Sequence, residues 1–552
     1  MKLSISPTAP PADVSRTRRE RLHSVAGLVC CVTSSVVAAA CFLPHQSLWN
    51  DEATQMSGLR LSPIGVVLWL TNRIDHDFGV PDDRMPPISY WAGWAWSKAF
   101  GLEEVPLRWL GVACVAAATA LVFDSARRGW GLASAWAAGL LFALSPNVAV
   151  QAVEIRAYPL LILASACIFA CLVRFLIAEE PGRTRWLIGL TASGILATYT
   201  HFFGLVASGA AFLAALVMTR ARRGRIGPVL VAGTVSGLAA MALIPFVFAS
   251  VGISRSMGAG FREKVAGLGR LAGRLLAHPS MMLHRYVIAA TIAGGVLALV
   301  GAIARRRTPV TGGLIVALAS GATVVAGVHL AQSSFDAASP SYNAWMLPAV
   351  ALLMASGLAS ASRTVRIGTA LGVAMMIAAD IDGIVQLAVH GDAFAHTPHR
   401  RIASIVRELG PDRVAIVHEH NSRERWQVYA PIRYEFGKTV PQYLYQGEGA
   451  DGPRLSSYPD PAKGDEPESR LPEYVIVIQS DSIHAPELVR RLQGPPTAKA
   501  DGPLAKEFSA SERWERVREA TFLAFIETHL DVFRRKDAGT IARTPLKEFT
   551  PR

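Results

Sequence analysis

The sequence predicts an all-α polytopic membrane domain of about eleven transmembrane helices, followed by a small extracytoplasmic α/β domain. Three observations support this fold class. Of the 552 residues, 51% are hydrophobic and only 18% are charged, whereas soluble proteins carry about 25% charged residues. Apolar runs recur through residues 1–390, and most are long enough to cross a bilayer. Between these runs, arginine-rich loops alternate with loops that contain few basic residues.

The net charge of +13 follows this topology and does not indicate a nucleic-acid partner. Residues 391–552 contain 24 Lys and Arg against 24 Asp and Glu, so that stretch is neutral. The whole excess, 31 basic against 18 acidic residues, lies in the apolar region before it. There the basic residues occupy short loops, as the positive-inside rule requires of cytoplasmic loops. We therefore expect membrane lipids around the chain and no nucleic acid.

The N-terminal tail, residues 1–23, is polar and basic, and the apolar run at 24–43 predicts an uncleaved first helix that starts in the cytoplasm. A cleaved signal peptide is the alternative, because Ala38-Ala39-Ala40 would suit a cleavage site. Ten further runs predict the remaining helices: 107–123, 132–148, 159–177, 186–203, 205–218, 226–251, 286–304, 310–330, 345–361 and 365–379.

Arginines cluster in loops that all fall on the side of the N-terminal tail. These are Arg127-Arg128, Arg183 with Arg185, residues 220–225, residues 305–307, and Arg363 with Arg366. The opposite side receives the first outer loop, residues 45–106, and everything after His390. We therefore expect a multi-pass protein of the plasma or inner membrane, with a transmembrane domain at 24–390 and an extracytoplasmic α/β domain at 391–552.

The α/β character of the C-terminal domain follows from short β-branched runs bounded by polar residues. Residues 413–418 and 474–479 predict strands, and residues 423–436 and 486–492 predict helices. Residues 447–472 are rich in Pro, Gly, Ser and acidic residues, which predicts a loop. Because this region has no Gly-rich phosphate loop and no nucleophile elbow, we expect no separate catalytic site in it.

The first outer loop carries the densest candidate chemistry, with eight acidic residues against four basic ones and five tryptophans. Residues 64–70 and 88–100 predict amphipathic helices in the membrane interface. Trp49-Asn50-Asp51-Glu52-Ala53 then lies at the membrane surface, where a poorly solvated acid pair suits a general base. The alternative is a structural turn in which Asn50 or Asp51 caps a helix and Glu52 benefits from the helix dipole.

Two further groups of the outer side have both a functional and a structural interpretation. Asp75-His76-Asp77 with Asp82-Asp83 could bind a divalent cation through oxygen and imidazole ligands, or form a solvated acidic loop. Near the third and fourth helices, Arg156 could hold a lipid phosphate with Tyr158 beside it, or serve as an interfacial anchor paired with Glu154. His201 lies in an aromatic turn on the same side, where a lone histidine is usually structural.

In their order and on one side of the membrane, these motifs resemble a known family. They are Trp49-Asn50-Asp51-Glu52-Ala53, Met85-Pro86-Pro87-Ile88-Ser89-Tyr90-Trp91, Arg156-Ala157-Tyr158, and Thr200-His201-Phe202-Phe203-Gly204-Leu205. Over about the first 390 residues the chain resembles the GT-C glycosyltransferases that use polyprenyl-phosphate sugars, in the group of protein O-mannosyltransferases and lipid A aminoarabinose transferases.

The resemblance implies an inverting transfer of a hexose or pentose at the outer membrane surface. Asp51 would be the catalytic base and Glu52 its support, while Arg156 and Tyr158 would bind the donor phosphate. The donor would be a polyprenyl-phosphate sugar, and the acceptor a protein, a lipid or a polysaccharide. The absence of a nucleotide-binding fingerprint agrees with such a donor, so no nucleotide cofactor is expected.

The resemblance has one departure, next to the Pro-Pro pair. Some family members have a charged residue directly before this pair, but here Met85 intervenes after Asp83 and Arg84. The roles of Asp83, Arg84 and His201 toward substrate or a divalent cation therefore stay open at this point.

Two other functions fit a polytopic chain. A transporter or flippase of envelope glycan precursors would place ionisable residues near the bilayer midplane, but the predicted helices are almost free of charge. A non-catalytic envelope-assembly factor would not need to retain Asp51, Glu52 and Arg156.

Overall fold

The computed structural model describes most of the chain and divides it into two compact units. The described residues are 14–74, 80, 83, 85–179, 182–251, 261–331, 337–419, 422, 424–449, 452–459, 465–466, 468–494 and 502–536. The helical unit comprises Met1–Leu43, Pro63–Arg73 and Arg84–Val389. The sheet unit comprises Pro44–Ser62, Ile74–Asp83 and His390–Arg552. The predicted domain boundaries stay predictions.

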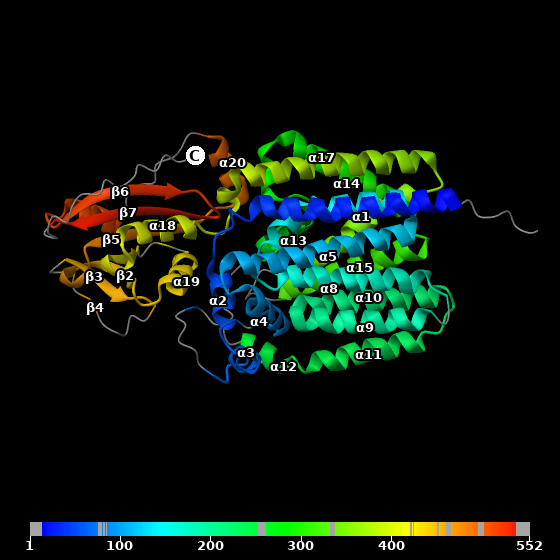
Figure 1. The fold of residues 1–552 in the computed structure, drawn as a ribbon, viewed down its shortest axis with the longest axis horizontal. Coiled ribbons are helices and arrows are strands. Elements are labelled where there is room, and N and C mark those ends of the chain that lie inside the picture. The colour runs from blue at the N-terminus through cyan, green and yellow to red at the C-terminus, as the bar shows by residue number, and fades with distance from the viewer. Residues whose placement is uncertain are drawn as a thin grey trace, which may run out of the picture. The chain divides into compact units, whose positions relative to one another are not determined.

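The helical unit consists of long apolar helices joined by short connections (Figure 1). Its helices are α1 (Val14–Phe42), α3 (Pro63–Leu70), α4 (Ile88–Phe100), α5 (Glu104–Trp130), α6 (Leu132–Ala143), α7 (Pro146–Ala152), α8 (Tyr158–Ile177), α9 (Arg183–Thr200), α10 (Phe202–Ala221), α11 (Gly227–Met241), α12 (Ile244–Val251), α13 (Phe261–Leu276), α14 (Arg285–Ala304), α15 (Pro309–Ala331), α16 (Leu347–Ala355) and α17 (Arg363–Phe394). Short 3₁₀ helices η1 (Pro279–Leu283), η2 (Ala344–Met346) and η3 (Ser356–Ala359) connect some of them. Helix α17 has a non-helical residue at His390, where the sheet unit begins.

All eleven apolar runs predicted from the sequence fall on helices, but a count of eleven spans is not confirmed. Within the described residues, seven single helices are long and apolar enough to cross a membrane, or eight if the bent pair α6 and α7 forms one span. Helix α11 and the segment Ala344–Ala359 are apolar but shorter. These helices make the chain a multi-pass membrane protein, and the orientation of its termini stays a prediction.

Small residues let these helices approach closely, as is usual where lipid removes the hydrophobic drive for helix association. A Cβ atom on Gly294 of α14 would lie 2.5 Å from the carbonyl oxygen of Gly372 on α17. A Cβ on Gly321 of α15 would lie 2.3 Å from the ring of Trp345, which is fully buried. Large apolar side chains such as Ile292 remain 63% exposed on the outer surface of the helices, as lipid contact requires.

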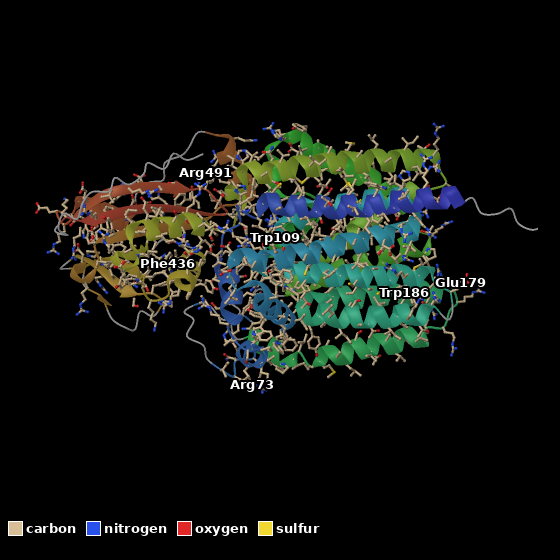
Figure 2. The ribbon with its side chains drawn as sticks, viewed as in Figure 1. Arg73, Trp109, Glu179, Trp186, Phe436 and Arg491 are labelled. Atoms are coloured by element: carbon tan, nitrogen blue, oxygen red, sulfur yellow. The ribbon has the colours of Figure 1, made fainter. Side chains whose placement is uncertain are left out.

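Ion pairs between helices mark one end of the helical unit. Figure 2 places Glu179 and Trp186 at one end and Trp109 toward the other. At the Glu179 end, Arg174 of α8 pairs with Asp124 of α5, which also pairs with Arg127 and Arg128. This end contains the arginine-rich connections that the sequence assigns to the cytoplasm. Helix α8 begins at the other end, at Tyr158.

The sheet unit contains one seven-stranded mixed sheet in the order β4-β3-β2-β1-β5-β7-β6. Its strands are β1 (Val414–His418), β2 (Gln442–Gly449), β3 (Gly452–Ser457), β4 (Asp465–Glu466), β5 (Tyr474–Ser482), β6 (Trp514–Phe522) and β7 (Ile526–Arg535). The central strand β1 pairs in parallel with β2 and β5, and all other pairs are antiparallel. The β1–α19–β2 connection, with α19 at Arg425–Phe436, is a βαβ unit.

Alternate residues of the central strands enter two separate apolar layers, because side chains of a strand point to opposite faces. Ile416 and Ile476 pack with α18 (His399–Leu409) and α19 on one face. Ala415 and Val477 pack with α21 (Pro503–Ala510) on the other. The sheet is therefore buried on both sides in its parallel centre.

The small C-terminal sheet domain was predicted, and four of its elements are confirmed: β1, β5, α19 and α20 (Ala485–Gln493). The prediction of a loop at 447–472 is wrong in part, because β3 and β4 lie there. Strand β3 reads Gly-Pro-Arg-Leu-Ser-Ser and pairs along most of its length with β2. Pairing with a neighbour, and not β propensity, gives it strand structure.

Candidate active site

The acid pair lies at the start of helix α2 (Asn50–Gly58), in the sheet unit. Trp49 is the extended N-cap residue and makes no side-chain cap hydrogen bond, so Asn50 and Asp51 are the first helical residues. The alternative that Asn50 or Asp51 caps this helix is therefore wrong. Both acids are in the first turn, where the helix dipole favours negative charge.

The two acids differ in exposure. Glu52 is fully buried, whereas Asp51 is half-buried and accepts a hydrogen bond from Nδ2 of Asn50 at 3.2 Å. Every residue of α2 from Glu52 to Gly58 is buried, and the helix packs against α19 of the same unit. Of the two acids, Asp51 is therefore the one that is partly exposed.

The Arg156 turn connects α7 to α8 in the helical unit and is held by buried contacts. Arg108 of α5 is fully buried, pairs with Glu104 at 2.7 Å, and donates a hydrogen bond to the carbonyl of Val153. A Cβ atom on Gly111 would lie 2.3 Å from the carbonyl oxygen of Ala152, so α5 touches this backbone directly. The turn that carries Arg156 is thus fixed against α5.

Side chains of the Arg156 turn differ in burial. Glu154 is 2% exposed and Tyr158 is 3% exposed, whereas Arg156 is half-buried. A guanidinium can make a planar two-point contact with phosphate. The arrangement therefore suits anion binding at this end of the helical unit.

Four aromatic rings gather next to this turn and form an aromatic cluster: Tyr158, His201, Phe203 and Tyr342. The ring centroids of Tyr158 and His201 are 5.7 Å apart, and those of His201 and Tyr342 are 5.6 Å apart. The structure thereby brings Tyr158 and His201, two residues singled out in the sequence, into one cluster. Such rings combine large apolar faces with, in tyrosine, a polar hydroxyl.

His201 has a structural role at the α9–α10 junction. Its Nδ1 accepts a hydrogen bond from the backbone N–H of Phe203 at 3.1 Å and so caps α10. A Cβ atom on Gly204 would lie 2.0 Å from the carbonyl oxygen of Ala197, so the junction requires glycine there. The Thr-His-Phe-Phe-Gly motif therefore encodes a tight turn that places the His201 ring in the aromatic cluster.

Three residues of this region were not singled out in the sequence: Gln151, Tyr342 and Asn343. Nε2 of Gln151 donates to Oγ of Ser341 at 3.0 Å, which fixes the loop before η2 against α7. Nδ2 of the fully buried Asn343 donates to the carbonyls of Ala337 and Ser339 at 2.8 and 2.9 Å. A turn-forming Ser-Pro-Ser before Tyr342 in an outer loop was the available signal.

The rest of the first outer loop is described only in part. The helices predicted at 64–70 and 88–100 are confirmed as α3 and α4, and the rings of Trp69 and Tyr90 meet edge to face at 5.8 Å. Asp83 is 9% exposed. Arg84, together with Asp75, His76, Asp77 and Asp82, lies outside the described residues. Among the residues that are described, no group of three or more His, Cys, Asp or Glu could hold a metal ion.

Comparisons with known proteins agree with this architecture. Residues 84–248 match a family model described as dolichyl-phosphate-mannose-protein mannosyltransferase. That segment includes Met85-Pro86-Pro87, Arg156, Tyr158 and the His201 turn. A sequence search of curated proteins finds no match.

Solved structures extend the likeness to nearly the whole chain. ArnT from Cupriavidus metallidurans in the apo state is 15% identical, with a TM-score of 0.50 over 91% of this chain and 97% of that one. ArnT bound to undecaprenyl phosphate is also 15% identical, with a TM-score of 0.48 over 92% of this chain and 98% of that one. A third structure is the archaeal oligosaccharyltransferase AglB from Archaeoglobus fulgidus in complex with an inhibitory peptide and a dolichol-phosphate. It is 11% identical, with a TM-score of 0.44 over 81% of this chain and 69% of that one. The chain thus has an ArnT-like fold, and its resemblance to the GT-C fold glycosyltransferases is confirmed.

Proposed function

We propose that this chain transfers a sugar from a polyprenyl-phosphate donor to an envelope or secreted acceptor at the outer face of the membrane. Asp51 is the general base, Glu52 supports it, and Arg156 with Tyr158 binds the donor phosphate. The transfer inverts the configuration of the anomeric carbon. The acceptor is a protein, a lipid or a polysaccharide.

One observation carries this proposal: the segment that matches the mannosyltransferase family model contains the Arg156 turn and its aromatic cluster residues Tyr158 and His201. The half-buried Arg156 offers charge-assisted hydrogen bonds, and phosphate is an anion that such a fork fits well. A lipid-linked donor needs its phosphate group bound where a helix bundle meets water. ArnT, which has this fold, has been crystallised with undecaprenyl phosphate.

The proposed reaction is a single displacement. The acceptor hydroxyl gives its proton to the Asp51 carboxylate while its oxygen forms a bond to the anomeric carbon. The bond between that carbon and the phosphate oxygen breaks, and polyprenyl phosphate leaves with the bonding electrons. Arg156 stabilises the charge on the leaving phosphate, which is where a fixed cation lowers the barrier. Glu52 has only a supporting role because its side chain is fully buried.

A transporter is the second candidate, and one buried acid bears on it. Asp380 of α17 is 5% exposed and lines a cavity of about 40 Å³ with Ser145 and apolar side chains. Intramembrane acids often mark transport paths. A cavity of this size holds about three water molecules and no sugar, so it offers little support for glycan transport.

Mass spectrometry of envelope glycans tests the proposal, with a deletion strain complemented by wild-type or variant protein at equal membrane levels. We expect one sugar residue to be absent in the deletion strain, to return with wild type, and to stay absent with Asp51→Asn. A transporter tolerates Asp51→Asn and depends instead on Asp380. Full restoration by Asp51→Asn would contradict the glycosyltransferase proposal.

A further inference from the structure

The segment that carries the acid pair is built into the sheet unit. Residues 44–62 follow the first helix closely in sequence, yet they cluster with residues 390–552. The proposed base is therefore attached to elements encoded more than 300 residues later in the chain. The contacts between these two segments determine where the base lies.

Five residues before α2 contact a short segment of the C-terminal region, residues 391–400, here called the strap. Nδ1 of His45 pairs with Oδ1 of Asp392 at 3.1 Å. The backbone N–H of Arg400 donates to Oγ of Ser47 at 3.4 Å, and its guanidinium donates to the carbonyl of Pro44. A Cβ atom on Gly391 would lie 2.4 Å from the His45 ring, so the two segments approach closely.

Two further contacts hold the residues next to Asp51, and one of them is fully buried. Thr397 is fully buried, and its Oγ1 donates to the carbonyl of Leu48 at 2.9 Å. The ring of His396 stacks on Trp49 with centroids 4.2 Å apart and planes 18° apart. Trp49 is the N-cap of α2, and Asp51 is its second residue. Thr397 and His396 thus fix the backbone immediately before the base.

The strap is itself anchored to the sheet. The backbone N–H of Ile526, the first residue of β7, donates to the carbonyl of His396 at 3.0 Å, and Phe525 donates to Ala395 at 3.2 Å. Helix α2 also packs on α19, where the guanidinium of Arg60 lies 4.5 Å from the ring centroid of Tyr434. Sheet, strap and α2 therefore form a continuous set of contacts.

We infer that the C-terminal domain positions the catalytic base, and that Thr397 is a positioning residue acting through Asp51. This inference rests on the proposed function of Asp51. A general base works only within hydrogen-bond reach of its proton, and a displacement of about 1 Å can cost on the order of 100-fold in rate. The Thr397 hydroxyl holds the Leu48 carbonyl, three residues before Asp51, where a small shift moves the carboxylate directly.

The test compares Thr397→Val, which removes the hydroxyl at nearly constant shape, with Thr397→Ser, which keeps it. The initial rate at which the sugar-modified glycan forms is measured in the deletion strain, with each variant present at the same level in the membrane. We expect Thr397→Val to be roughly 10- to 100-fold slower and Thr397→Ser to stay within about threefold of wild type. Binding of undecaprenyl phosphate to the purified full-length protein should be unchanged in both variants, because the strap holds the base and not the donor phosphate.

Thr119→Val in α5 is the matched control for loss of a fully buried hydroxyl that bonds to a backbone carbonyl away from the strap. Thr119 is also fully buried, and its Oγ1 donates to the carbonyl of Val115 at 2.9 Å. We expect this control to keep wild-type rates. Wild-type rates in Thr397→Val, equal impairment of Thr397→Ser, or equal impairment of the control would each overturn the inference.

A double-mutant cycle separates this inference from the proposed function. If Thr397 acts only through Asp51, Thr397→Val should cause no further loss in the Asp51→Asn background. An inactive Asp51→Asn with a fully active Thr397→Val would overturn the inference and leave the proposed function standing. A fully active Asp51→Asn would overturn the proposed function itself.

Discussion

The two groups of candidate residues are held in place by different physics. Helix α2, with Asp51 and Glu52, is fixed by hydrogen bonds and ring stacking to residues almost 350 positions later, such as the Thr397–Leu48 bond. The Arg156 turn is fixed inside the helical unit by close helix approach at Gly111 and by the buried Arg108. The proposed base thus depends on the C-terminal domain, and the proposed phosphate site depends on the helix bundle. Substitutions that disturb α2 or its contacts should therefore lower the rate of transfer, whereas substitutions in the Arg156 turn should weaken donor binding.

The largest expected effect is that of Asp51→Asn. A positioned base contributes about 10²- to 10⁴-fold to rate, so glycan formation should fall by at least the lower figure. Membrane level and thermal stability should barely change, because Asp51 is not the N-cap of α2 and is only half-buried. Glu52→Gln should be milder in rate. If Glu52→Gln abolished transfer and Asp51→Asn kept normal turnover, the two roles would be reversed.

The next effect is expected at the phosphate site. Arg156→Ala should weaken binding of undecaprenyl phosphate by roughly 1.5–3 kcal/mol, the usual cost of losing a charge-assisted hydrogen bond. Binding is measured on purified protein in detergent. Arg156→Lys should restore only part of the affinity, because an ammonium cannot make the planar two-point contact. Unchanged affinity in a well-folded Arg156→Ala protein would remove Arg156 from the donor site.

Glycine substitutions test whether the helical unit is held by close packing. Gly204→Ala should destabilise the α9–α10 junction by about 1–3 kcal/mol, because overpacking forces the backbone apart and the new Cβ would lie 2.0 Å from the Ala197 carbonyl oxygen. Gly209→Ala in the same helix is the control, since a Cβ atom added there would meet no other atom within 4 Å. Thermal unfolding in detergent should separate the two variants. Equal melting temperatures would argue against this account of the junction.

The smallest effect is a pH dependence confined to the sheet unit. Burial lowers the pKa of His418 to about 4 from 6.5, and His418 bonds through Nε2 to Oε1 of Gln442 at 3.0 Å. Between these values the unfolded chain binds a proton that the folded chain does not, so stability falls as pH falls through this window. The loss from pH 7.5 to 5.5 should be about 1 kcal/mol.

Protease susceptibility of the C-terminal domain in the full-length protein measures this pH effect. His418→Gln has no titrating group at this position, so its susceptibility should change less between the two pH values than that of wild type. An equal change in both proteins would show that other groups cause the pH dependence.

The sequence predicted the parts of the fold whose pattern is local. Long apolar runs located the helices, and β-branched runs located the buried strands β1 and β5. Strand β6 was missed because four of the nine residues in its sequence, Trp-Glu-Arg-Val-Arg-Glu-Ala-Thr-Phe, are charged. Its strand structure comes from pairing with β7. The predicted count of eleven spans is not confirmed, because apolar runs such as that of α11 form helices shorter than the seven or eight candidate spans among the described residues.

For the candidate site, the sequence located residues but not what holds them. Asp51, Arg156 and Tyr158 followed from short motifs, whereas Tyr342 joins the aromatic cluster from a loop more than 140 residues after His201. The grouping of α2 with the C-terminal domain also depends on contacts between distant segments. A single sequence carries no local signal for such contacts.

The central claim is that this chain transfers a sugar from a polyprenyl-phosphate donor to an acceptor. The stoichiometry of the wild-type reaction tests this claim most directly. Purified full-length protein in vesicles would receive the polyprenyl-phosphate sugar identified by glycan mass spectrometry, together with its acceptor and no nucleotide. We predict one free polyprenyl phosphate for each sugar attached to the acceptor, with the opposite anomeric configuration in the product. Donor that crosses the vesicle membrane intact, with no polyprenyl phosphate released, would contradict the account.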